Sequence, residues 1–235
     1  ALGALSVVDM AVITIHAVNG VEVCTETMWN HASQLGIPKM LVVNGLDREH
    51  TKFDSILEQA RKRFGNNVFP MQLPVNEGPG YNQNVDVLRT ELISYQADGS
   101  GKMTEGELPE ELKEKVKGLH EELIEYVAES DDTLLEKFFE QGSLSEEEMR
   151  NGIHRAIQDQ TFIPLFCTSA TSNIGVARVC DFISKYGSSP DDRKTVTAQD
   201  DQGNDVDVSL DGSETVLQIF KTMSESHVGE LSLFR

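Results

Sequence analysis

Short, mostly apolar runs alternate with helical patterns in the first seventy residues, and this alternation limits the fold more than any other feature. Residues 10–15 are apolar and rich in β-branched side chains, and 39–43 are apolar after Lys39, which predicts two buried strands. Helical patterns follow each of them, at 23–35, where Gly36 ends the helix, and at 51–64. Strands that alternate with helices are joined by right-handed crossovers, so the sequence predicts an α/β fold with a parallel sheet.

A different pattern interrupts this alternation. Residues 68–75 and 85–95 predict strands, whereas 109–159 is helical almost throughout. Between Glu105 and Arg150 there are 16 acidic and 5 basic residues, more than half of the excess negative charge of the chain. The simpler interpretation of this acidic block is a set of solvated helix faces, and the alternative is a surface that docks a partner protein.

The first pattern then resumes. Residues 162–167 predict another buried strand and 176–186 its partner helix, so the interruption is an insertion inside one domain. Residues 187–192 have the composition of a linker. Beyond the linker, 216–221 and 230–234 predict strands of a further β domain that this chain does not complete.

Charge and cysteine content exclude several classes of protein. The net charge of −19 argues against general binding to a nucleic-acid backbone, which needs a basic surface. No apolar run reaches the length of a membrane-spanning helix. The three cysteines form no Cys-x-x-Cys pair, which makes a disulfide framework or a zinc site improbable and favours a reducing compartment. The chain has no initiator methionine, and we expect it to be a piece of a longer protein.

The sharpest candidate motif is Asn44-Gly45-Leu46-Asp47, directly after the strand at 39–43. Ligands of open parallel sheets bind beyond the carboxyl ends of the strands. The Asp47 carboxylate can accept hydrogen bonds from both N1–H and the 2-amino group of guanine, a charge-assisted bidentate pair. Adenine offers neither donor and would leave a buried carboxylate unpaired. Taken alone, the motif fits a capped turn before the next helix equally well.

A second motif makes guanine recognition the better interpretation. Thr168-Ser169-Ala170 follows the strand at 162–167, and the backbone N–H of Ala170 can donate to the guanine carbonyl oxygen. By itself a Ser-Ala pair is more often a helix N-cap. Because both motifs follow strands of one parallel sheet, we predict that Asn44, Asp47, Ser169 and Ala170 bind a guanine base.

These residues resemble a known family. Residues 42–49 are similar to the guanine-recognition segment of elongation factor G, the translocation GTPase of the bacterial ribosome. The other stretches that resemble this family, in chain order, are 9–22, 53–64, 108–112, 163–176, 220–222 and 227–232. The resemblance therefore extends over nearly the whole chain.

The resemblance implies a layout and a function. The implied domains are 1–67 as part of the GTPase domain, 68–160 as its inserted α+β subdomain, 161–190 as its final strand and helix, and 191–235 as a linker and the start of β-barrel domain II. The parent protein would bind GTP or GDP with Mg²⁺ and act on the ribosome in the cytoplasm. Its inserted subdomain would face the ribosomal stalk protein, which gives the acidic block a functional interpretation.

Two departures from the family bear on this. Gly45 stands where the family usually has a lysine, whose stem lies over the base and whose amine braces the phosphate loop. The segment Gly187-Ser188-Ser189-Pro190 departs from the usual Leu-Pro-Ser-Pro. Both departures suggest a divergent paralogue of the main translocase.

The residues that carry out phosphoryl transfer are not found in the sequence. The run nearest to a phosphate loop, Gly99-Ser100-Gly101-Lys102, has Gln96 at the first glycine position and Met103 at the hydroxyl position, so a hairpin turn is expected there. No Asp-x-x-Gly motif precedes the first helix, and His16 is interpreted as a satisfied core histidine. We therefore predict no catalytic or metal-binding residue, and no GTP hydrolysis by this chain alone.

Three hypotheses follow. The chain is the base-reading part of a GTPase of the elongation factor G type. Alternatively, it comes from a divergent paralogue with weak or no GTPase activity, whose acidic insert docks a protein. The third hypothesis, an unrelated α/β protein with chance motifs, is disfavoured by the ordered resemblance.

Overall fold

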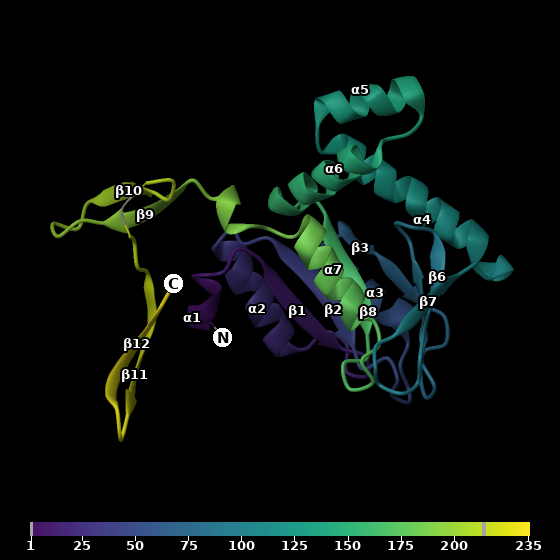
Figure 1. Cartoon of the computed structure of the whole chain (residues 1–235), viewed down its shortest axis with the longest axis horizontal. Helices are drawn as coiled ribbons and strands as arrows, with labels where there is room; N and C mark the ends of the chain where they lie inside the picture. The colour runs from purple at the N-terminus through teal and green to yellow at the C-terminus, as the bar shows by residue number, and fades with distance from the viewer. Residues whose placement is uncertain (1, 213–214) are drawn as a thin grey trace.

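The computed structural model describes residues 2–212 and 215–235. Its centre is a four-stranded parallel sheet in the order β1-β2-β8-β3 (Figure 1). The strands are β1 (Ala11–His16), β2 (Lys39–Asn44), β8 (Ile163–Thr168) and β3 (Val68–Pro70). All six residues of β8 are buried, as expected for a central parallel strand covered on both faces. The predicted α/β class with a parallel sheet is confirmed.

Helices that follow the strands cover this sheet. They are α2 (Val23–Gln34), α3 (Phe53–Phe64) and α7 (Val176–Tyr186), preceded by the single turn α1 (Leu2–Leu5). Trp29 of α2 stacks on Phe64 of α3 with ring centroids 4.3 Å apart, so these two helices pack side by side. Phe182 of α7 packs on Phe166 of β8. Aromatic side chains thus join the helices to each other and to the sheet.

The insertion has a sheet followed by three helices. Its antiparallel strands pair in sequence order and are β4 (Gln72–Pro74), β5 (Gln83–Asp86), β6 (Glu91–Tyr95) and β7 (Met103–Gly106). The helices are α4 (Glu110–Glu129), α5 (Asp132–Gln141) and α6 (Glu146–Gln158). The Asp131 side chain caps α5, and Ser145 forms a capping box with Glu148 at the start of α6. These caps divide the predicted helical stretch at 109–159 into three helices.

Two predicted strands are wrong in extent. The segment 68–75 is two strands, β3 in the parallel sheet and β4 in the inserted sheet, because Val68 and Phe69 are fully buried beside β8. The segment 85–95 is likewise divided into β5 and β6, with a turn in which Thr90 has a positive φ of 54°. The parallel sheet therefore includes β3, which the sequence had grouped with the insertion.

After the one-turn 3₁₀ helix η1 (Pro190–Asp192), two separate antiparallel hairpins complete the described chain. They are β9 (Thr195–Gln199) with β10 (Asp205–Ser209), and β11 (Ile219–Glu225) with β12 (Gly229–Phe234). The second hairpin overlaps the strands predicted at 216–221 and 230–234, with bounds that differ by at most four residues. It fits the expected start of a β domain. Among residues 2–212 and 215–235, no helix has the length and apolar character needed to cross a bilayer.

Candidate functional site

The two predicted motifs meet at one edge of the parallel sheet. Asn44 ends β2, Thr168 ends β8, and the two residues are paired in register. The Asn44 Oδ1 atom accepts a hydrogen bond from the backbone N–H of Ala170 at 2.9 Å and another from Thr168 Oγ1 at 3.2 Å. The Asn44 amide therefore ties the two loops together, as expected for strands whose carboxyl ends lie side by side.

A tight turn presents Asp47. The N–H of Arg48 donates to the Gly45 carbonyl at 3.1 Å, and the N–H groups of Gly45 and Leu46 both donate to the Thr168 carbonyl. Gly45 has a φ of +87°, a conformation that glycine adopts without a steric penalty, and Leu46 is fully buried beneath the turn. The backbone of this turn is thus fixed to β8 while Asp47 lies half-buried at its surface.

The Asp47 carboxylate has unused capacity. Its Oδ2 atom accepts from Ser172 Oγ at 3.1 Å, and Oδ1 has no hydrogen-bond partner among residues 2–212 and 215–235. The sequence analysis missed Ser172, because nothing in a Thr-Ser pair marks which hydroxyl will face the carboxylate. The predicted residue Ser169 has a fully buried side chain, and its backbone pairs with Ile174.

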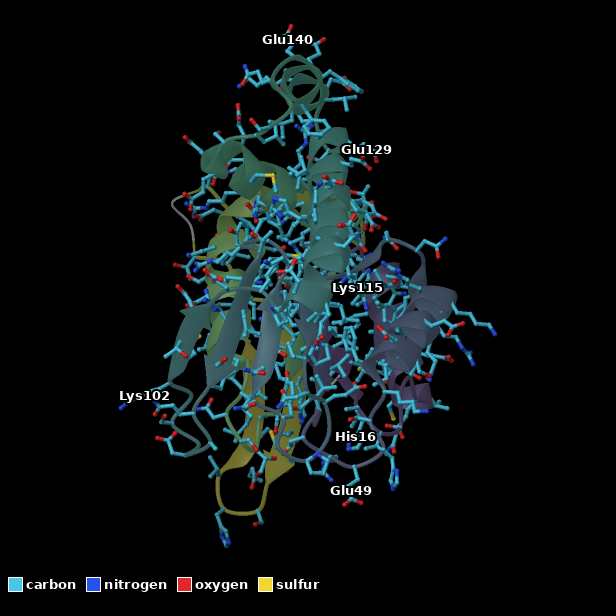
Figure 2. The ribbon with its side chains drawn as sticks, turned by 90° about the vertical axis from the view of Figure 1, so that its right-hand side faces the viewer. His16, Glu49, Lys102, Lys115, Glu129 and Glu140 are labelled. Carbon is cyan, nitrogen blue, oxygen red and sulfur yellow. The ribbon has the colours of Figure 1, made fainter. Side chains whose placement is uncertain are left out.

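The insertion contacts both loops. Its Gly78 N–H donates to the Leu46 carbonyl at 2.7 Å, and the Asn173 side chain donates to the Gly99 carbonyl at 3.2 Å. Gly99 lies in the turn between β6 and β7, so the run that is nearest to a phosphate loop is a hairpin turn, as predicted. Figure 2 shows Lys102 of this hairpin toward the same end of the molecule as His16 and Glu49.

His16 and Cys167 have structural environments. The Nδ1 atom of His16 accepts from the N–H groups of Val18 and Asn19, so this histidine is satisfied, but it is half-buried at the end of β1 and does not lie in the core as predicted. Burial raises the pKa of the Cys167 thiol well above its usual range, and its Sγ atom donates to the Gln72 carbonyl. The Cys167 thiol therefore does not have the character of an activated nucleophile.

A groove of about 590 Å³ lies beside this edge. It is lined by residues of α1, β1 and α2, including His16 and Cys24, and by Asn44. In the part of the chain that the structure describes, no group of three His, Cys, Asp or Glu side chains is placed to hold a metal ion. The donors and acceptors that gather at this edge fit the polar edge of a base.

Comparison with known proteins identifies a family. The family model of the elongation factor Tu GTP binding domain matches residues 2–189, most of the chain. The chain belongs to this family. It is also similar to a solved structure, the crystal structure of ttk003000868 from Thermus thermophilus, with 27% sequence identity and a TM-score of 0.82. That similarity covers 100% of this chain and 32% of the other, so the chain spans about a third of its length. The predicted kinship with translation GTPases is confirmed.

Proposed function

We propose that this chain binds the guanine base of GTP or GDP, as part of a translation GTPase of the elongation factor G type that acts on the ribosome in the cytoplasm during polypeptide elongation and translocation. The observation that carries the proposal is the pairing of Asn44 with Ala170 beside the open carboxylate oxygen of Asp47. Family membership supports the guanine nucleotide as ligand.

The chemistry of recognition follows from the donors and acceptors. Asp47 accepts from N1–H and the 2-amino group of guanine, and the exposed Ala170 N–H, which now donates to Asn44, is shared with the guanine carbonyl oxygen. Ser169 acts through the backbone of its loop. Adenine has an acceptor at N1 and no 2-amino group, so its edge repels the carboxylate.

We assign GTP hydrolysis to the full-length parent protein. The sequence holds no complete phosphate-loop pattern, and phosphoryl transfer depends on positioning of the phosphates and Mg²⁺. Phosphate and Mg²⁺ binding are therefore assigned to other parts of the parent protein, and binding of the guanine base to this chain.

The test is displacement of a fluorescent GDP from the intact protein. We expect GTP to displace the probe and ATP to leave it bound. Asp47→Asn should lose GDP binding and gain binding of xanthosine diphosphate, because the new amide donates to the 2-oxo group of xanthine. The matched control is Asp54→Asn on the exposed face of α3, where the side chain pairs with Lys115 away from the proposed base. Absence of GDP binding at high micromolar protein would overturn the proposal.

The second candidate is a divergent paralogue in which the acidic insertion docks a partner such as the ribosomal stalk protein. It is favoured by Gly45 in place of the family lysine and by Phe139 of α5, a residue that is 78% exposed and has acidic neighbours in the sequence. Figure 2 shows Glu129 and Glu140 at the end of the molecule opposite His16 and Glu49. This candidate would be favoured if the protein binds ribosomes but no GDP, and if Phe139→Ala abolishes the binding to ribosomes.

A further inference from the structure

Within the part of the chain that the structure describes, Arg48 is the arginine whose charge is not used by the fold. Its side chain is exposed, and among residues 2–212 and 215–235 it has no ion pair and no side-chain hydrogen bond. Every other arginine donates to or pairs with a described group, whether a carbonyl or a carboxylate. These are Arg61, Arg63, Arg89, Arg150, Arg155, Arg178, Arg193 and Arg235.

The Arg48 side chain folds back over the turn that carries Asp47. A Cβ atom placed on Gly45 would lie 3.5 Å from both Cδ and Nε of Arg48, which is van der Waals contact. The turn itself is closed by the hydrogen bond from the Arg48 N–H to the Gly45 carbonyl. Glycine therefore leaves the space beside the turn to the side chain of Arg48, the residue that follows Asp47.

From this geometry we infer that Arg48 covers one face of the purine when Asp47 holds its edge. The inference rests on the proposed function and names a further binding residue of the same site. A guanidinium is planar and stacks on aromatic faces, and a stack needs no hydrogen-bond partner from the fold. The carboxylate that reads the edge and the cation that covers the face then come from adjacent residues of one turn.

The charge of the molecule gives this cation a second effect. The chain carries a net charge of −19, which repels a nucleotide with its negative phosphates. An unpaired cation at the edge of the site offsets part of this repulsion locally. An arginine that was already paired with a carboxylate would offset less of the repulsion, because its charge would be compensated.

The test compares the dissociation constants of GDP and inosine diphosphate, which lacks the 2-amino group, for the intact protein and its variants. Arg48→Ala should raise the dissociation constants of both nucleotides by about fivefold. The ratio of the two constants should stay unchanged, because stacking does not depend on the 2-amino group. Arg48→Lys should recover part of the loss, since it restores the charge without the plane. The control Arg63→Ala removes the same charge from α3, where it pairs with Glu26, and should change neither constant.

The outcomes separate this inference from the proposed function. If the unmodified protein binds no GDP, both are overturned. The inference alone is overturned if three results are found together. The unmodified protein binds GDP, Asp47→Asn does not bind GDP, and the dissociation constant of GDP for Arg48→Ala is within about twofold of that for the unmodified protein. A change in the GDP to inosine diphosphate ratio, or a lower thermal midpoint of the nucleotide-free variant, would show that Arg48 holds the turn, and would also overturn the role in stacking.

Discussion

At the residue scale, side chains with satisfied charges can be told from side chains that are free to bind a ligand. Lys39 is 2% exposed, yet its Nζ atom donates to the Ile37 carbonyl and to Gln160 and lies 5.1 Å from the centre of the Trp29 ring. Burial lowers the pKa of Lys39, and these partners compensate the buried cation. By contrast, the Asp47 carboxylate has a free oxygen at the surface, as an acceptor for an external ligand should.

Asp86 provides a test of pH dependence at this scale. Burial raises the pKa of its carboxyl above the ordinary 3.8, although the Arg89 N–H and the charges of Arg178 and Arg89 oppose the shift. Between pH 3.8 and the raised pKa the folded state binds more protons than the unfolded state, so this group makes the free energy of unfolding fall as pH rises.

We predict that Asp86→Asn stabilises the protein at pH 7, and that the gain shrinks as the pH approaches 3.8. Asparagine keeps an acceptor for the Arg89 N–H and removes the cost of a buried charge. Urea unfolding of both proteins across this pH range measures the difference. A variant that is less stable at pH 7 would show that the contacts of the ionised carboxylate outweigh the cost of its burial.

The positions of the proposed base-binding residues could be predicted in part from the sequence, for a physical reason. Parallel strands bring their carboxyl ends to one edge of a sheet, so Asn44 and Ala170 could be expected at the same edge. They are neighbours because β2 and β8 are adjacent strands. The contact of Ser172 with Asp47 and the fold of Arg48 over Gly45 depend on side-chain rotamers inside two loops. No periodicity or spacing encodes those rotamers.

At the scale of elements, the loop between β4 and β5 supports the turn that carries Asp47. Glu77 of this loop accepts the Phe53 N–H at 2.7 Å, at the start of α3, where the N-cap residue Lys52 forms no side-chain cap. The next residue, Gly78, donates to the Leu46 carbonyl. One loop of the insertion therefore fixes both ends of the segment that joins β2 to α3.

Glu77→Ala is predicted to destabilise the protein by about 1 kcal/mol, the usual cost of a lost helix cap. It should also weaken GDP binding by a few fold, because the turn that carries Asp47 loosens. Glu77→Gln keeps an acceptor for the Phe53 N–H and should restore most of the stability. Glu107→Ala, at an exposed glutamate, is the matched control. Thermal unfolding and GDP titration measure both effects, and equal midpoints for the alanine and glutamine variants would contradict the capping role.

The divided strands show where element prediction fails. An apolar run indicates burial but not the partner strand, so the sequence predicted one strand at 68–75. In the structure Met71 lies between the two sheets. Its N–H donates to the Leu165 carbonyl of the parallel sheet, and its carbonyl accepts from the Val87 N–H of the insertion. The turn between β5 and β6 has no glycine or asparagine, and Thr90 adopts the left-handed conformation there. Tertiary pairing decided both boundaries, and local propensity did not.

At the scale of the whole molecule, the first and last described segments are joined. Arg235, after β12, forms two hydrogen bonds with the Asp9 carboxylate, at 2.9 and 2.6 Å, and donates to the Val7 carbonyl. Arg193 lies 4.0 Å from the same carboxylate. The β11–β12 hairpin exposes Ile219 and Phe234, and an isolated hairpin is marginally stable, so these contacts hold it against the GTPase domain.

Arg235→Ala should therefore loosen the hairpin without loosening the parallel sheet. The lost bidentate pair contributes about 1 kcal/mol, which corresponds to about fivefold faster amide exchange in β11 and β12. Arg235→Lys should rescue little, because an ammonium cannot match both carboxylate oxygens. Hydrogen exchange followed by mass spectrometry reports the two regions separately. Faster exchange in β2 and β8 as well would mean that the hairpin and the sheet unfold as one unit, whereas unchanged exchange in the hairpin would mean that its remaining contacts with α1 are sufficient to hold it.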